Sequence, residues 1–245
     1  MTTNFAQGMV LAAATLLVGQ SSPRPARAQE AKAPYPAMFP LDQYLIADRD
    51  AEIALAKSAA PPALSRDATV LVLEKDGYHT AIEGKNGFAC IVERSWMSPL
   101  DSTDFWNPKL RGPICYNPPA ARSILPYTIL RTKLILGGLT KDQMVEKIQT
   151  ELAGSLLPIP EPGAMSYMMS KNQYLGDSAG HWHSHLMFHL PHTGTAASWG
   201  ANLEGSPVVV DTYHAQGPEP ETIFMVPVDH WSDGSAANDS ATHQH

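Results

Sequence analysis

The chain has 245 residues and a formal net charge of −7, with 24 acidic against 17 basic side chains. Nucleic-acid binding depends on Lys and Arg side chains that neutralise phosphates, so this balance argues against nucleic acid as a partner. After residue 28 no apolar run approaches the length of a membrane-spanning helix, so we expect no stable membrane insertion.

The N-terminus has the pattern of an export signal. The apolar stretch over residues 9–18 is too short to span a bilayer, and a small-x-small cleavage site, Ala-Arg-Ala, follows at residues 26–28. No Lys or Arg precedes the apolar stretch, which leaves a short membrane anchor as the alternative. Pro23 and Pro25 would break a helix that continued from the apolar stretch toward the domain. We therefore expect a signal peptide over residues 1–28 and a periplasmic or secreted product.

The two cysteines of the chain, Cys90 and Cys115, are expected to pair. In an oxidising compartment an even cysteine count predicts a disulfide, whereas two buried free thiols are the alternative. No CxxC pattern or basic cluster marks either residue as a reactive thiol. A disulfide that closes a loop of about 25 residues would contribute roughly 3–4 kcal/mol of stability in the chain-entropy model.

The first half of the chain predicts one helix and three strands. Residues 29–40 hold several prolines and are expected to form an extended linker, and a helix follows with Asp42 as its N-cap and an end before Pro61. Turn-forming residues separate three β-branched and apolar segments, at residues 69–74, 78–83 and 88–94. Their close spacing predicts a three-strand antiparallel meander.

The second half predicts a loop, two helices and several strands. Residues 96–119 are rich in Pro and Trp and are expected to form an ordered loop. Residues 120–136 fit a helix, although residues 124–135 also fit a strand, and a capping box at residues 140–143 opens a helix that ends at Ala153. Residues 166–170 follow, and further strands are then expected at residues 181–190, 207–211 and 222–228.

This order of elements predicts an α+β fold in a single domain over residues 41–231. The expected sheet is antiparallel and combines the three-strand meander with about three C-terminal strands, with the helices packed on one face. Residues 232–245 are rich in small and polar side chains and are expected to form a disordered tail.

The clearest functional signal is residues 181–190, which hold four of the ten histidines. Side chains alternate across a strand, so Trp182 and Leu186 would lie on a core face. The opposite face would carry His181, His183, His185, Met187 and His189. A core does not need a row of imidazoles, so the pattern indicates a metal or ligand site, with a solvated polar face as the alternative.

Strand geometry limits which histidines can share one ion. Residues two apart lie about 7 Å apart along a strand and residues four apart about 13 Å, so a neighbouring pair is expected to bind together, and His183 belongs to either pair. A third ligand would come from another segment, and His79 is preferred over the weaker candidates Glu83, Glu93, Asp211 and His214. The predicted ligand set is His79, His181, His183 and His185, and imidazole suits zinc or copper.

If the site is catalytic, the expected chemistry is metal-assisted hydrolysis, in which Glu83 or Glu93 takes a proton from a metal-bound water. No recognisable base accompanies Ser166 or Ser170, so the sequence does not support a serine nucleophile. Two non-hydrolytic hypotheses stay open. One is a small-ligand sensor or carrier, with a layout similar to that of PAS- and GAF-like modules, and the other is a periplasmic copper-handling protein. The expected partner is therefore a small molecule or a metal ion.

Overall fold

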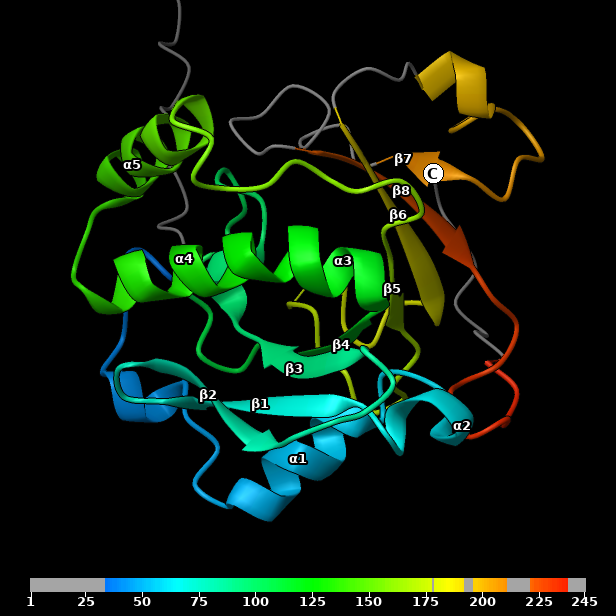
Figure 1. The fold of residues 1–245 in the computed structure, drawn as a ribbon, viewed down its shortest axis with the longest axis horizontal. Helices are drawn as coiled ribbons and strands as arrows, with labels where there is room; N and C mark the ends of the chain where they lie inside the picture. The colour runs from blue at the N-terminus through cyan, green and yellow to red at the C-terminus, as the bar shows by residue number, and fades with distance from the viewer. Residues whose placement is uncertain (1–33, 178, 192–195, 211–220, 238–245) are drawn as a thin grey trace, which may run out of the picture. The chain divides into compact units, whose positions relative to one another are not determined.

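The computed structural model describes residues 34–177, 179–191, 196–210 and 221–237. They form an eight-stranded sheet in the order β2-β1-β3-β4-β5-β6-β8-β7 (Figure 1). The strands are β1 (Thr69–Glu74), β2 (Gly77–Ile82), β3 (Ala89–Glu93), β4 (Gly112–Tyr116), β5 (Met165–Met168), β6 (His185–Pro191), β7 (Val209–Val210) and β8 (Glu221–Pro227). The α-helices are α1 (Arg49–Lys57), α2 (Pro62–Ser65), α3 (Pro118–Ser123), α4 (Leu125–Leu136) and α5 (Lys141–Ala153). Short 3-10 turns are η1 (Leu41–Gln43), η2 (Ser95–Met97) and η3 (Ala196–Trp199).

The α+β class is confirmed, but the first three strands do not form a meander. β1 pairs antiparallel with β2 and parallel with β3. After β2 the chain crosses the start of β1, where a Cβ added to Gly84 would lie 2.1 Å from the backbone nitrogen of Thr69. The backbone N–H of Lys85 donates to the carbonyl of Asp67 and holds this crossing. The glycine-rich segment is therefore a crossover rather than a hairpin turn, and it brings β3 to the other side of β1.

The expected loop over residues 96–119 contains a central strand, β4. It pairs antiparallel with β3 along its whole length, from Tyr116 opposite Ala89 to Gly112 opposite Glu93. All of its residues are buried. Gly and Pro are rare within strands, so the presence of Gly112 and Pro113 led to the prediction of a loop rather than a strand.

The helices follow local signals in the chain. Thr140 forms the expected capping box at the start of α5. Residues 125–136 are helical, so the interpretation of residues 124–135 as a strand is wrong, and the helix expected over residues 120–136 is divided at Ile124 into α3 and α4. The first helix begins later than expected because Asp48, rather than Asp42, caps α1 by accepting two backbone N–H groups at 2.9 and 3.2 Å. No helix in the described part of the chain has the length and apolarity needed to cross a bilayer.

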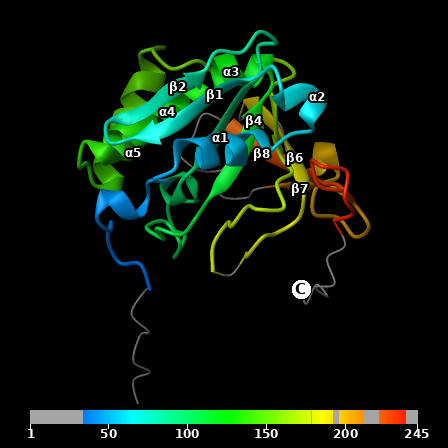
Figure 2. The same ribbon diagram turned by 90° about the horizontal axis from the view of Figure 1, so that it is seen from below.

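Helices lie on both faces of the sheet, so the prediction of one covered face is wrong. α3 and α4 lie over one face, and α1 lies against the other (Figures 1 and 2). Alternation along β3 shows this division, since Ile91 belongs to the cluster beneath α4 whereas Cys90 and Val92 belong to the cluster with α1. The physical reason is that the central strands are apolar on both faces, and residues 70–73 are all buried.

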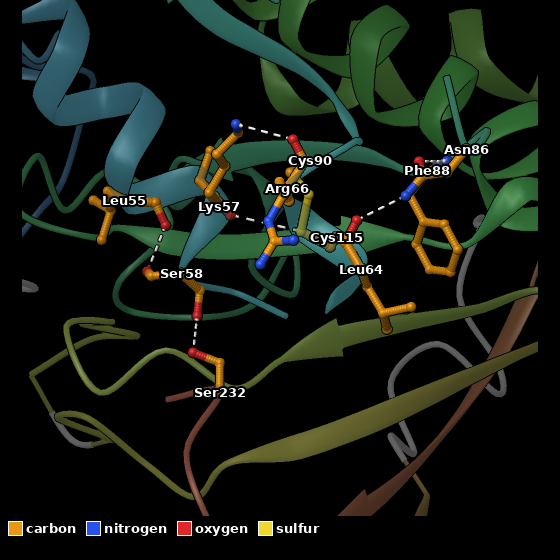
Figure 3. The surroundings of a disulfide bond; sticks show 11 residues. Leu55, Lys57, Ser58, Leu64, Arg66, Asn86, Phe88, Cys90, Cys115 and Ser232 are labelled. Atoms are coloured by element: carbon orange, nitrogen blue, oxygen red, sulfur yellow. Dashed lines mark hydrogen bonds between the residues drawn. A yellow bond between two sulfur atoms is a disulfide. The ribbon is translucent and has the colours of Figure 1, made fainter. Parts of the chain in front are cut away.

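Cys90 and Cys115 form the predicted disulfide, on the α1 face of the sheet (Figure 3). They lie directly opposite each other in the β3–β4 pair, with Cα atoms 4.0 Å apart. Both are fully buried in a cluster that includes Ala56 of α1. The disulfide therefore joins β3 to β4 on the α1 face of the sheet. The side chains directly before and after each cysteine point to the other face, which α4 covers.

The histidine strand is shorter than predicted. β6 begins at His185, and Trp182 has a φ of 40°, in the left-handed region. This backbone turn ends the alternation, so the prediction that Trp182 lies on a core face opposite the histidines is wrong. From His185 onward the alternation holds, and His185, Met187 and His189 are all buried.

The ordered domain extends beyond its expected C-terminal boundary. Ser232 lies in the expected tail, but its hydroxyl donates to the Ser58 carbonyl at 2.6 Å (Figure 3). Its backbone N–H donates to the Met169 carbonyl at 2.8 Å. Ser232 is therefore held to the domain by two hydrogen bonds, while the expected signal peptide over residues 1–28 and residues 238–245 lie outside the described residues.

Candidate functional site

A cavity of about 370 Å³ lies on the face of the sheet that α4 covers. This volume is in the range of small-molecule sites. Most of its wall is apolar, formed by Met97, Leu110, Ile114, Ile124, Met168, Leu175, Met187, Ile223 and Met225. Methionine side chains are flexible and adapt to the shape of a bound molecule, so this wall suits an apolar ligand.

Strand register brings the polar groups of the cavity floor together. Residues opposite one another in an antiparallel pair point to the same face. The register places Tyr116 opposite Ser166, and Ser166 opposite Met187. Alternation along the strands then puts the other polar floor residues on the same face: Glu93, His185, His189 and Glu221. A buried sheet face thus carries five ionisable side chains where apolar ones would be usual.

The first hydrogen-bond network joins β3, β4 and α4. The Tyr116 hydroxyl donates to Glu93 Oε1 at 2.7 Å and lies 3.1 Å from Thr128 Oγ1. Burial raises the pKa of the Glu93 carboxyl to about 7, although the hydrogen bond from Tyr116 acts in the opposite direction. Burial and the nearby Glu93 charge also raise the pKa of the Tyr116 phenol well above its ordinary value. Glu93 therefore changes its protonation state near neutral pH.

The second network joins β5, β6 and β8. His189 Nδ1 lies 2.5 Å from Glu221 Oε2, and His189 Nε2 lies 2.8 Å from Ser166 Oγ. An ionised carboxylate can only accept, so Nδ1–H donates to Glu221. In the neutral imidazole Nε2 is then an acceptor, and the Ser166 hydroxyl donates to it. The three residues are 0–4 % exposed, so water does not compete for these bonds.

His185 presents a neutral imidazole to the cavity. Its Nδ1–H donates to the carbonyl of His183 at 2.7 Å, and its ring meets the Trp182 ring edge to face at 4.5 Å. Burial lowers the pKa of His185 to about 4, so the ring is uncharged at neutral pH. With the proton on Nδ1, Nε2 is an acceptor for a ligand hydroxyl or N–H.

The four predicted metal ligands lie in different places. His181 is exposed in the loop before β6, where its Nδ1–H donates to the Gln173 carbonyl at 2.6 Å, and His183 lies in the same loop. His79 lies on the edge strand β2, five strands away from β6 in the sheet, and its Nε2 is 2.8 Å from Asp76 Oδ1. His185 alone of the four lines the cavity.

Within the described ranges, one group of three potential ligand side chains has its ligand atoms within 4.8 Å of one another: Glu74, Asp76 and His79. All three are exposed at the β1–β2 hairpin. Of the two predicted catalytic acids, Glu93 lines the cavity, whereas Glu83 is exposed after β2. The weaker donor candidates Asp211 and His214 lie outside the described residues.

Sequence reasoning missed the two hydrogen-bond partners of His189, which are Glu221 and Ser166. His189 was recognised as a member of the row, but its contact with Glu221 depends on the pairing of β6 with β8, which lie more than thirty residues apart. Ser166 also reaches His189 only through the β5–β6 pair. Local motifs contain no signal for such contacts, although alternation along residues 185–189 correctly places His189 on the same face of the strand as His185.

Glu93→Gln is expected to gain stability relative to the wild type as the pH rises. The pKa of Glu93 is raised from 4.5 to about 7 by folding, so its contribution is fully present below pH 4.5 and is lost as the pH rises through 7. At about 1.4 kcal/mol per pH unit the upper limit is roughly 3 kcal/mol. The side chain borders the cavity and is only partly buried, so a smaller value is expected.

Urea unfolding of both proteins at about pH 5 and about pH 8 measures this difference. Glu83→Gln, at an exposed position, is the matched control and should show no such trend. A Glu93→Gln effect that is the same at both pH values would contradict the shifted pKa.

Two buried networks, Glu93–Tyr116–Thr128 and Ser166–His189–Glu221, thus meet one largely apolar cavity. Buried polar groups with several partners at a concave site are typical of ligand-binding and catalytic centres. In comparisons with protein-family models, with curated proteins and with solved structures, the chain matches none of them.

Proposed function

We propose that the domain binds a small, largely apolar molecule in the cavity beneath α4. The observation that carries this proposal is the combination of an apolar wall with polar groups gathered on the floor. An apolar wall supplies affinity through burial, and a few placed polar groups orient the ligand. A small-molecule ligand, as in the sensor or carrier hypothesis from the sequence, is therefore preferred over a metal ion.

The charges at the floor favour a neutral ligand over a carboxylate. Glu221 is an acceptor, and Glu93 becomes negative as the pH rises through about 7. A carboxylate placed beside these groups in an apolar setting would be repelled. Neutral hydroxyl or carbonyl groups instead find an acceptor at His185 and a donor in protonated Glu93.

Fluorescence titration with Nile red, a neutral apolar dye, tests the proposal. We expect saturable binding and displacement of the dye by octanol but not by octanoate. Met225→Trp, which adds bulk at the cavity wall, should weaken dye binding at least about tenfold. Leu156→Trp, at an exposed position, is the matched control and should bind as the wild type does. Equal binding by both variants would contradict the proposal.

The metal hypothesis has less support from the described residues, because they bring no three of the predicted ligands together. Zinc or copper binding by His181, His183 or His185 stays a prediction from sequence. We also propose an oxidising location, periplasmic or secreted, because the Cys90–Cys115 disulfide is formed and disulfides persist in such compartments.

A further inference from the structure

We propose that Ser166, His189 and Glu221 form a nucleophilic triad that hydrolyses a neutral carboxylic ester held in the cavity. The inference deepens the proposed function, on which it rests, since the substrate would be the ligand of the cavity. Nucleophile, base and orienting acid are recognised by geometry and roles rather than by position in the chain.

The hydrogen bonds assign one role to each residue. Glu221 accepts from His189 Nδ1–H at 2.5 Å, which fixes the tautomer of the ring. In the neutral ring His189 Nε2 then carries the lone pair, and it lies 2.8 Å from Ser166 Oγ. This is the arrangement in which an imidazole removes the proton of a serine hydroxyl and is itself stabilised by a carboxylate once charged.

The sheet holds these roles in place. Ser166 lies opposite Met187, so His189 is its diagonal neighbour on β6. His189 lies opposite Ile223, so Glu221 is its diagonal neighbour on β8. Both contacts are thus set by strand register rather than by mobile loops, and sites on regular elements are held precisely.

Two of the three triad residues face the cavity, and Ser166 lies fully buried beside them. His189 and Glu221 line it, as do Tyr116 and Met187, which flank Ser166 on the two neighbouring strands. The protonated carboxyl of Glu93 borders the same space and can donate to a developing oxyanion, while the Tyr116 hydroxyl already donates to Glu93 Oε1. In an apolar cavity such a donor acts more strongly than it does in water.

The reaction balances with water as the second substrate. Ser166 Oγ gives its proton to His189 Nε2 and forms a bond to the ester carbonyl carbon. The carbon–oxygen bond to the alcohol then breaks, and the alcohol leaves with that proton. Water attacks the acyl-serine and gives a proton to His189, which returns it to Ser166 Oγ as the acid leaves. Ester and water thus become carboxylic acid and alcohol, and Ser166 is restored.

A fluorophosphonate probe and a p-nitrophenyl ester together test the triad. We expect the wild type to take up one probe on Ser166, located by peptide mass spectrometry, and to hydrolyse p-nitrophenyl butyrate. Ser166→Ala should lose labelling and at least about 1,000-fold in kcat, with His189→Gln similarly impaired. Ser170→Ala is the matched control, because Ser170 is also fully buried but bonds to Ser58 Oγ at 2.6 Å.

Nile red binding separates the possible failures. If the wild type binds the dye but is neither labelled nor active, the triad is overturned and the binding function stands. If Ser166→Ala loses only stability and keeps its esterase rate, the network is structural and the triad is again overturned. If Ser166 is labelled and active but the dye does not bind, the triad stands and the proposed apolar ligand is wrong.

Discussion

Glu52→Ala is expected to lower the free energy of unfolding by about 3–5 kcal/mol, because it leaves a buried charge without its partner. Arg94 Nη2 lies 2.8 Å from Glu52 Oε1, and the two side chains are 0 % and 1 % exposed. The same Glu52 oxygen accepts the backbone N–H of Leu73 at 3.1 Å. One carboxylate therefore joins α1 to β1 and to the end of β3, and its loss affects all three.

The surroundings of Arg94 explain why water cannot replace the Glu52 carboxylate as the partner of its charge. Its Nε–H donates to the carbonyl of Tyr44 at 2.6 Å, and a second N–H donates to the carbonyl of Val92. These bonds hold the guanidinium at a fixed position in the core. Without Glu52, the charge would have to stay buried or pull the surrounding segments apart.

Glu74→Ala is the matched control, because Glu74 pairs with Arg49 at 3.0 Å while both side chains are about half exposed. Exposed pairs of this kind contribute about 0–1 kcal/mol. Urea unfolding at neutral pH compares the two variants. Similar losses for Glu52→Ala and Glu74→Ala would show that the buried pair has no special role.

The double variant Cys90→Ala/Cys115→Ala is expected to lose about 3–4 kcal/mol, because the open chain has more conformational freedom when unfolded. The disulfide has a sequence separation of 25 residues and joins two central strands. Urea unfolding of the variant against the oxidised wild type measures the loss.

Reduced wild-type protein is the control that separates the loss of the disulfide from the loss of packing caused by the smaller alanine side chains. It lacks the bond but keeps both sulfur atoms, so the difference between it and the double variant reports the gap left by the smaller side chains. Mass spectrometry after alkylation without prior reduction verifies the state of each sample. An unchanged unfolding midpoint in fully reduced wild type would contradict a stabilising role for the bond.

Local signals predicted much of the fold. The capping box at Thr140 and the β-branched residues 69–74 both mark elements that exist, because caps and alternation act over a few residues. The Cys90–Cys115 pair followed from an even cysteine count together with the export signal. The crossover at Gly84 and the strand containing Pro113 were missed, since both depend on which distant segment becomes the neighbour.

The residues of the candidate site likewise fall into those that local patterns predicted and those that depend on strand pairing. Alternation predicted a strand face that carries imidazoles, and the structure shows His185 and His189 of that face to be buried. Glu93 was predicted as a catalytic acid, and it lines the cavity. The partners that define the chemistry, Ser166 and Glu221, are brought in by strand pairing. A single sequence carries no direct record of that pairing.

The two polar networks lie on opposite sides of the narrow β4–β5 junction. β4 and β5 share two register pairs, Cys115 with Tyr167 and Tyr116 with Ser166, whereas β6 and β8 share seven. The β4–β5 junction therefore has fewer backbone contacts than the β6–β8 pair to resist a change of twist. A small change of twist there would alter the separation of Tyr116 from His189 without breaking a bond inside either network. A cavity whose width changed in this way would keep the hydrogen bonds of its floor and would accept ligands of different width.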